Sequence, residues 1–214
     1  MFFVFDGIDG AGKSTQIARF VRWLQAAGRT VVECRDPGGT ELGERIRDLL
    51  LVPSSLPIAS RAETLLYMAS RAQLVTETIA PALAAGKTVV SDRFVSANVA
   101  YQSFGSGMPL EDLLAVADFA VGTTVPDLIF VLDLDVETAA TRVGSTPDRI
   151  EARGSDYFRR VRDGFLALES IWPGRVVTID ARADADEVHR RVVAAAERYL
   201  HASTAETDRS APRR

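Results

Sequence analysis

The sequence predicts an α/β fold with three layers (α/β/α) around a five-stranded parallel sheet. Short apolar runs rich in β-branched residues alternate with segments of helical spacing, which is typical of strands joined by crossover helices. The apolar runs contain few polar positions, as expected for strands that are buried on both faces. A glycine-rich turn joins the first run directly to a helical segment, which is a third sign of this fold class.

Each element follows from its local pattern. The expected strands are Phe2–Asp6, Thr30–Arg35, Thr88–Ser91, Leu128–Leu134 and Val176–Ile179. The expected helices are Ser14–Ala27, Glu63–Ala85, Leu110–Ala120 and Asp184–Leu200. Gly28 and Gly86 follow two of these helices, at the position where glycine commonly ends a helix. The parallel strands require right-handed crossovers.

Composition predicts a single domain and excludes several classes of protein. The chain has 214 residues, 47% of them hydrophobic, and we expect one domain over 1–200 with a disordered polar tail over 201–214. A net charge of −4 gives no indication of a nucleic-acid or membrane partner. No apolar run approaches a membrane span or a signal peptide, and the single cysteine fits a reducing compartment. We therefore expect a cytoplasmic protein.

A phosphate-binding loop is predicted between the first strand and the first helix. Its glycines allow backbone N–H groups to surround a polyphosphate, and the helix N-terminus adds a favourable partial charge. Lys13 can reach the β- and γ-phosphates, and the Ser14 hydroxyl can ligate Mg²⁺. The alternative is a glycine-rich turn that caps an ordinary helix. We expect nucleoside triphosphate binding by Gly7, Ile8, Asp9, Gly10, Ala11, Gly12, Lys13, Ser14 and Thr15.

A second basic site is predicted where the third strand ends. Ligands of such sheets bind at the carboxyl ends of the strands, and Asp92 and Arg93 lie there. Asp92 can help to hold a metal ion, whereas the fork of Arg93 suits a phosphate. Arg35 and Pro37 follow the second strand and face the same edge. The alternatives are a helix cap and a tight turn.

The helical segment 63–85 carries a candidate base-recognition pair. Tyr67 and Arg71 are four residues apart, so they share a face on which they can stack on a base and donate to its edge. An exposed cation–π pair is an equally plausible alternative. The core stripe of this helix is expected at Leu65, Ala69, Ala72 and Ile79.

A polar segment at about 144–154 is predicted to be a lid. Arg149 within it can fold over a transferred phosphoryl group, although a solvated loop charge is the alternative. The later arginines at helical spacing are expected to be exposed or salt-bridged on the surface: Arg159, Arg160 and Arg162.

Taken together, these motifs resemble the thymidylate kinase family, which has the P-loop nucleoside triphosphate hydrolase-like fold. The resemblance spans nearly the whole chain, and DRFVSANVAYQ with the upstream ASR is its most specific part. The matching segments are DGIDGAGKST from Asp6, RDPGGT from Arg35, LLYMASRAQLV from Leu65, DRFVSANVAYQ from Asp92 and DRIE from Asp148.

The resemblance implies transfer of the ATP γ-phosphoryl group to the 5′-phosphate of dTMP, giving dTDP and ADP. Lys13 would follow the phosphoryl group, Ser14 and Asp92 would organise Mg²⁺, Arg93 would hold the acceptor phosphate, and Asp9 would orient the acceptor side. Tyr67 would stack on thymine, Arg71 would donate to O4, Asn98 would contact the base and Tyr101 would press on the deoxyribose. Arg142 is a candidate for covering adenine. The family is commonly homodimeric, so we expect a homodimer.

Several positions depart from the family pattern. Asp6 and Asp36 stand where glutamate is usual, which shortens each side chain by one methylene. Ala97 replaces the usual serine, and a helical step of about 100° keeps Ser96 from substituting for it. Gly10 occupies a position where some members carry arginine, and members with glycine draw a catalytic arginine from the lid, which indicates Arg149.

Rival functions remain on the same scaffold. The acceptor could be another nucleoside monophosphate such as dUMP, or a nucleoside, although a nucleoside does not explain Arg93 at a second phosphate site. A nucleotide-dependent switch is the rival from another class. A GTPase should carry an Asn-Lys-x-Asp segment, and the sequence has none.

Overall fold

Five parallel strands form one sheet in the order β2-β3-β1-β4-β5. The computed structural model describes residues 1–214 apart from 54, 143–148, 151–152 and 211–214, and it gives residues 203–210 as backbone only. Strand β1, which precedes the predicted phosphate loop, lies in the middle of the sheet between β3 and β4. The strands are β1 (Phe2–Asp6), β2 (Val31–Arg35), β3 (Thr88–Asp92), β4 (Leu128–Asp133) and β5 (Val176–Asp180).

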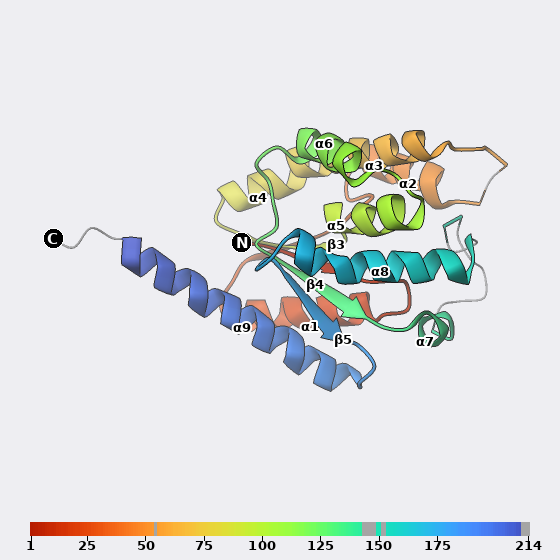
Figure 1. The fold of residues 1–214 in the computed structure, drawn as a ribbon. Helices are drawn as coiled ribbons and strands as arrows, with labels where there is room; N and C mark the ends of the chain where they lie inside the picture. The colour runs from red at the N-terminus through yellow and green to blue at the C-terminus, as the bar shows by residue number, and fades with distance from the viewer. Residues whose placement is uncertain (54, 143–148, 151–152, 211–214) are drawn as a thin grey trace.

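Helices cover both faces of the sheet, which confirms the predicted three-layer fold (Figure 1). Helices α1 and α9 pack together on one face, whereas α5, α6 and α8 lie on the other. The helices are α1 (Lys13–Ala26), α2 (Glu41–Leu51), α3 (Ser60–Leu74), η1 (Val75–Ile79), α4 (Ala80–Ala84), α5 (Val95–Asn98), η2 (Val99–Gly105), α6 (Leu110–Val121), α7 (Val136–Ala140), α8 (Ser155–Ile171) and α9 (Ala185–Ser210).

The element boundaries agree with the sequence in most places. Every expected strand is present with ends within one residue, and the expected helix 63–85 is present as α3, η1 and α4 in succession. No bounds were predicted for α2, α5, η2, α7 and α8, although the spacing of Arg159, Arg160 and Arg162 indicated a helix within α8. Helix α9 continues through Ser210, beyond the expected start of the tail at residue 201, so the backbone of 201–210 is helical. The division into a domain and an unpacked tail stays a prediction.

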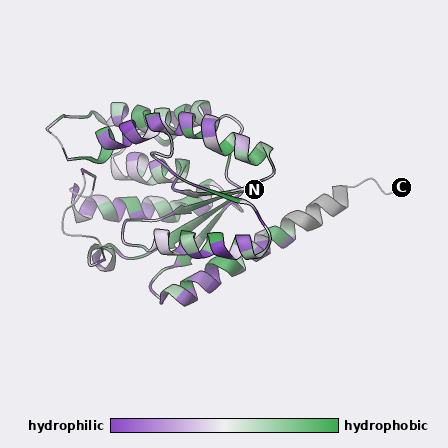
Figure 2. Cartoon of the chain, turned by 180° about the vertical axis from the view of Figure 1, so that it is seen from behind, coloured by the Kyte–Doolittle hydropathy of each residue, from purple (hydrophilic) through white to green (hydrophobic). Residues whose placement is uncertain are grey.

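An aromatic cluster forms the centre of the core. Phe20 of α1 is fully buried, and its ring lies 5.2 Å from that of Phe3, 5.4 Å from that of Phe5 and 5.4 Å from that of Phe130. Figure 2 shows the strands as the most hydrophobic part of the chain, between helices of mixed hydropathy. Within the described chain, no helix is both long enough and apolar enough to cross a membrane.

The buried face of α3 is polar, and the predicted apolar stripe on it is wrong. Leu65 is 57% exposed and Ala69 is also exposed, although Ile79 is buried as expected. Arg71, which the sequence placed away from the core, is only 1% exposed. The buried residues of α3 are Glu63, Thr64, Met68, Ser70, Arg71 and Leu74. Three of these polar side chains, Glu63, Ser70 and Arg71, hydrogen-bond to residues outside the helix.

We expect Phe20→Ala to lower the free energy of unfolding by about 3–5 kcal/mol, because it removes a ring that joins α1 to two strands. Urea unfolding followed by circular dichroism measures the change. Leu166→Ala on α8, at a side chain that is 39% exposed, is the control, with an expected loss below about 1 kcal/mol. Equal losses in the two variants would contradict the central place of Phe20.

Candidate active site

The glycine-rich loop lies at the carboxyl end of β1, where close backbone contacts require glycine. Gly7 has a φ of 133° and Gly10 a φ of 84°, in a region that other residues rarely adopt. A Cβ on Gly7 would lie 2.5 Å from the carbonyl oxygen of Leu132, and one on Gly10 would lie 2.4 Å from that of Ala139. An arginine at position 10 would therefore displace α7. With glycine there, the loop has no basic side chain at position 10.

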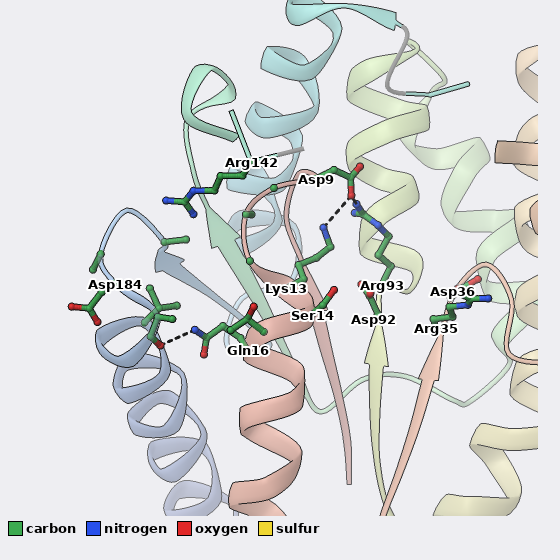
Figure 3. A pocket seen from close by; sticks show the side chains of 18 of the residues that line it. Asp9, Lys13, Ser14, Gln16, Arg35, Asp36, Asp92, Arg93, Arg142 and Asp184 are labelled. Carbon is green, nitrogen blue, oxygen red and sulfur yellow. Dashed lines mark hydrogen bonds and ion pairs between the residues drawn. The ribbon is translucent and has the colours of Figure 1, made fainter. Parts of the chain in front are cut away.

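A cavity of about 760 Å³ opens in front of this loop and the N-terminus of α1 (Figure 3). Arg142 and Asp184 lie toward one end of it, and Arg35 and Asp36 lie at the other. The helix start adds a favourable field for an anion. The cavity is lined by Asp9, Gly10, Ala11, Gly12, Lys13, Ser14, Thr15, Gln16, Arg35, Asp36, Arg47, Asp92, Arg93, Arg142, Ala181, Ala183, Asp184, Ala185 and Val188.

Lys13 is held inside the loop by three oxygens. Its Nζ donates to the carbonyl oxygens of Gly7 at 3.1 Å and Ile8 at 3.0 Å, and to Oδ1 of Asp9 at 3.3 Å. Burial, followed by the nearby positive charge of Arg93, lowers the pKa of Lys13. Gly7 and Ile8 thus serve the loop by fixing the ammonium group beside the cavity.

Arg93 joins the third strand to the loop. It has a φ of 68°, and its guanidinium donates to Gly7 O at 3.0 Å, to Asp9 Oδ1 at 2.7 Å and to the Tyr101 hydroxyl at 3.2 Å. Burial opposes the charge of Asp9, but Arg93 and then Lys13 outweigh it and hold the pKa of Asp9 below its usual range. The ion pair is therefore stable at neutral pH.

A second cavity of about 260 Å³ lies next to the first. The two cavities share Asp9, Asp36, Arg47 and Arg93 in their walls. Ligands bound in the two cavities would therefore meet at these charged side chains. The smaller cavity is lined by Asp9, Asp36, Pro37, Arg47, Leu51, Tyr67, Arg71, Arg93, Ala97, Asn98, Tyr101, Gln102 and Ile150.

The predicted base-recognition residues meet in the smaller cavity. Tyr67, Arg71, Asn98 and Tyr101 line it together with Pro37. The Nε of Arg71 donates to Oδ2 of Asp36 at 2.5 Å, and its guanidinium lies 5.2 Å from the centre of the Phe94 ring. Because both members of this ion pair are buried, Arg71 has one fixed position in the cavity wall.

Arg149 lies elsewhere in the structure. It is not among the described residues that line either cavity; its guanidinium instead pairs with Glu63 and donates to the carbonyl oxygen of Leu50. The predicted lid at about 144–154 falls largely outside the described residues. As predicted, Arg159 and Arg162 form salt bridges, whereas Arg160 donates to the carbonyl oxygen of Gly105.

Sequence reasoning missed several residues of the site. Arg47 lines both cavities and donates to the carbonyl oxygen of Pro37 at 2.9 Å. It was missed because α2 was not predicted, although Thr40 caps this helix and Ile46 and Leu50 show helical spacing. Gln102 ends the segment DRFVSANVAYQ but was given no role, and the segment of α9 and its preceding loop that borders the larger cavity carried no signal of its own.

The walls of the larger cavity also fit a divalent cation. Ser14 presents its hydroxyl there, and Asp92 lies at the end of β3 in the same wall. Oδ1 of Asp92 is buried without a hydrogen-bond partner in the described part of the chain. A buried, unpartnered carboxylate oxygen beside a phosphate loop suits Mg²⁺, which prefers oxygen ligands.

Asp6, the last residue of β1, is fully buried next to Arg93. It accepts a hydrogen bond from the Ser96 hydroxyl, and its Oδ1 lies 3.7 Å from NH1 of Arg93. Burial raises the pKa of Asp6 to about 7. Ser96 thus turns toward the sheet, which agrees with the expectation that it does not substitute for the serine replaced by Ala97.

Comparison with known proteins shows that nearly the whole chain is similar to thymidylate kinases. A family model described as "Thymidylate kinase" matches residues 5–192. The thymidylate kinase of Pelotomaculum thermopropionicum is 46% identical over 94% of both chains, and that of Bifidobacterium longum subsp. infantis is 40% identical over 97% of this chain and 91% of its own. The crystal structure of thymidylate kinase from Ehrlichia chaffeensis superposes with a TM-score of 0.73 at 32% identity, covering 90% of this chain and 96% of that one.

We expect Asp6 to make folding less favourable as the pH rises from about 4 to about 7. Over that range the carboxyl ionises in the unfolded chain but stays protonated in the folded one, so the folded state binds more protons and its stability falls. The maximal effect of the shift is about 4 kcal/mol. Urea unfolding of wild type and Asp6→Asn at several pH values measures it. A stability difference between the two that is constant from pH 4 to 8 would contradict the raised pKa.

Proposed function

This chain belongs to the thymidylate kinase family, and we propose how its two cavities divide the family's reaction between them. The enzyme transfers the γ-phosphoryl group of ATP to the 5′-phosphate of dTMP, giving dTDP and ADP. The observation that carries the proposal is that Asp9 and Arg93 line both cavities. A donor in one and an acceptor in the other would bring two phosphates to the same guanidinium.

The larger cavity is proposed to hold ATP. The loop from Gly7 to Thr15 and the start of α1 would surround the triphosphate, and Lys13 would neutralise the charge of the migrating group. Adenine would lie toward Arg142 and the segment between β5 and α9, at the end of the cavity away from the acceptor. The volume of this cavity, about 760 Å³, supports the binding of a whole nucleoside triphosphate.

The smaller cavity is proposed to hold dTMP. Arg93 would hold the acceptor phosphate in line, with Asp9 orienting that side and Arg35 contributing charge nearby. Tyr67 would stack on thymine above Pro37, and Tyr101 would pack on the deoxyribose. The remaining two side chains, Arg71 and Asn98, would hydrogen-bond the base edge.

Mg²⁺ is proposed to bind at Ser14 and Asp92, whose oxygens fit it as described above. When bound, the ion would neutralise charge on the phosphates. The protein's own contribution is to keep the Ser14 hydroxyl and the Asp92 carboxylate on the cavity wall and to place Lys13 and Arg93 on either side of the phosphates (Figure 3).

Arg149 keeps its proposed role of covering the transferred phosphoryl group as part of a lid. Its position in the structure adds a condition to that role. The ion pair with Glu63 and the hydrogen bond to Leu50 would have to open before the guanidinium could reach the phosphates.

We further propose that the protein is a homodimer and works in the cytoplasm, where its nucleotide substrates are. The adjacent helices α2, α3 and α6 expose large apolar side chains. Phe119 is 93% exposed and Leu65 is 57% exposed, and Leu42 and Leu49 of α2 are also exposed. Exposed apolar side chains gathered on neighbouring helices are typical of a protein interface.

We expect a coupled ADP-release assay with ATP and Mg²⁺ to give strong preference for dTMP over dUMP, dCMP, UMP, CMP, AMP and dGMP. Arg93→Ala should lower kcat/KM for dTMP about 10³-fold, mainly through KM, because it removes the fork that holds the acceptor phosphate. Lys13→Ala should instead lower kcat with little change in KM, because it acts on the migrating group.

The matched control for this assay is Arg45→Ala. Arg45 is an exposed arginine whose ion pair with Glu41 lies on the surface of α2, so activity should stay close to that of wild type. Near-normal kcat/KM in Arg93→Ala would refute the acceptor site, and selective turnover of another nucleotide would refute the choice of dTMP.

The homodimer is tested by sedimentation velocity. Wild type should sediment as a dimer, and Leu65→Lys should shift it toward monomer because a charge in a buried apolar interface is unfavourable. Leu166→Lys on α8, also at an exposed apolar position, should leave the dimer intact. A monomeric wild type, or a dimer unaffected by Leu65→Lys, would overturn the assignment of this face.

A further inference from the structure

A chain of buried polar side chains runs from α3 to the wall of the smaller cavity. Glu63, Gln102 and Asn98 are exposed by 1%, 1% and 2%, respectively. Nε2 of Gln102 donates to Oε1 of Glu63 at 3.0 Å, and Nδ2 of Asn98 donates to Oε1 of Gln102 at 2.7 Å. Gln102 and Asn98 line the cavity, whereas Glu63 lies behind them.

Glu63 determines the direction of every hydrogen bond in this chain. It ion-pairs with both Arg149 and Arg153, so it is a carboxylate that can only accept. Gln102 must therefore turn its N–H₂ group toward Glu63, which leaves its oxygen for Asn98. Asn98 in turn must donate to Gln102, and its own oxygen is left over. Since the carboxylate fixes this order, the order does not depend on how the two amides were assigned.

The oxygen that is left over belongs to Asn98, in the wall of the smaller cavity. Oδ1 of Asn98 is buried and has no hydrogen-bond partner among the described residues. A buried acceptor without a partner is costly, so its presence in a cavity wall indicates a donor on the ligand. The same wall contains the guanidinium of Arg71, a donor that Asp36 holds in place.

Asn98 and Arg71 thus give the cavity wall an acceptor and a donor in fixed places. A pyrimidine with an N3–H group and an O4 atom presents the complementary pair, which describes both thymine and uracil. Cytosine presents the reverse pair, with an unprotonated N3 and an N4 amino group. In this cavity cytosine would place acceptor against acceptor and donor against donor.

We propose that Glu63 is a specificity-determining positioning residue, which acts through Gln102 to turn the Asn98 oxygen toward the base and thereby selects 4-oxo pyrimidines over 4-amino pyrimidines. This inference rests on the proposed placement of the acceptor base in the smaller cavity. Glu63 itself touches neither substrate. The selection depends on its being an acceptor only.

The test is Glu63→Gln, which keeps the size of the side chain but allows it to present either oxygen or N–H₂. Both amides can then reverse, and Asn98 can offer an N–H group to N3 of cytosine. We expect the ratio of kcat/KM for dTMP to that for dCMP to fall by at least about tenfold. The ratio for dTMP to dUMP should stay unchanged, because these two bases carry the same groups at N3 and O4.

A purely structural role predicts a different result. If Glu63 only anchors Arg149 and Arg153, Glu63→Gln lowers kcat/KM for all acceptors alike and leaves the dTMP to dCMP ratio at its wild-type value, which would overturn the proposal. Glu63→Asp keeps an acceptor-only group and should retain more of the selectivity than Glu63→Gln. Gln102→Leu interrupts the chain without removing either ion pair and should also lower the ratio.

Two controls keep the outcomes separate. Glu187→Gln removes a carboxylate that pairs with Arg190 and Arg191 on α9, and it should change neither ratio. Thermal melts show whether each variant is folded, and the Kd of dTMP and dCMP measured by calorimetry gives the selectivity of any variant too slow to assay. A wild type that fails to prefer dTMP over dCMP refutes the acceptor assignment itself, whereas a selective wild type with an unchanged ratio in Glu63→Gln refutes only the role of Glu63.

Discussion

The ion pair between Arg93 and Asp9 is the interaction on which the rest of the site depends. It joins the end of β3 to the phosphate loop after β1, and these are neighbouring strands in the centre of the sheet. A second hydrogen bond to Gly7 fixes the guanidinium to the loop backbone. Because Arg93 has a positive φ, its backbone also turns at this point, so the side chain crosses toward the loop. The two cavities meet at this pair.

The buried charges around this pair explain why the site can be both stable and reactive. Asp9 pairs with both Lys13 and Arg93, and this pairing lowers the cost of burying the three charges. Phosphoryl transfer needs charge neutralisation and alignment rather than covalent chemistry from the protein. A preassembled set of paired charges supplies both, since an incoming phosphate can share the same donors.

Side chains in the wall of the smaller cavity are also held in place by partners behind them. Arg71 is fixed by its ion pair with Asp36 and Asn98 by its hydrogen bond to Gln102, so these partners determine how both side chains are oriented in the cavity wall. These supporting residues come from β2's following loop, α3 and η2, which are distant in sequence. Burying so much polarity on α3 leaves Leu65 and Ala69 on the outside of that helix.

Local patterns in the sequence determined the strands, the phosphate loop and the residues at strand ends, because each depends on neighbours along the chain. Spaced glycines, a preceding apolar run and a lysine at fixed spacing are enough to predict Gly7–Thr15 as an anion site. Tertiary structure alone decided that Arg71 is buried, that Arg47 lines both cavities, that Arg149 pairs with Glu63 and that the Asn98 oxygen has no partner. Each of these depends on which side chains from other elements lie opposite, and the periodicity of a single helix carries no information about that.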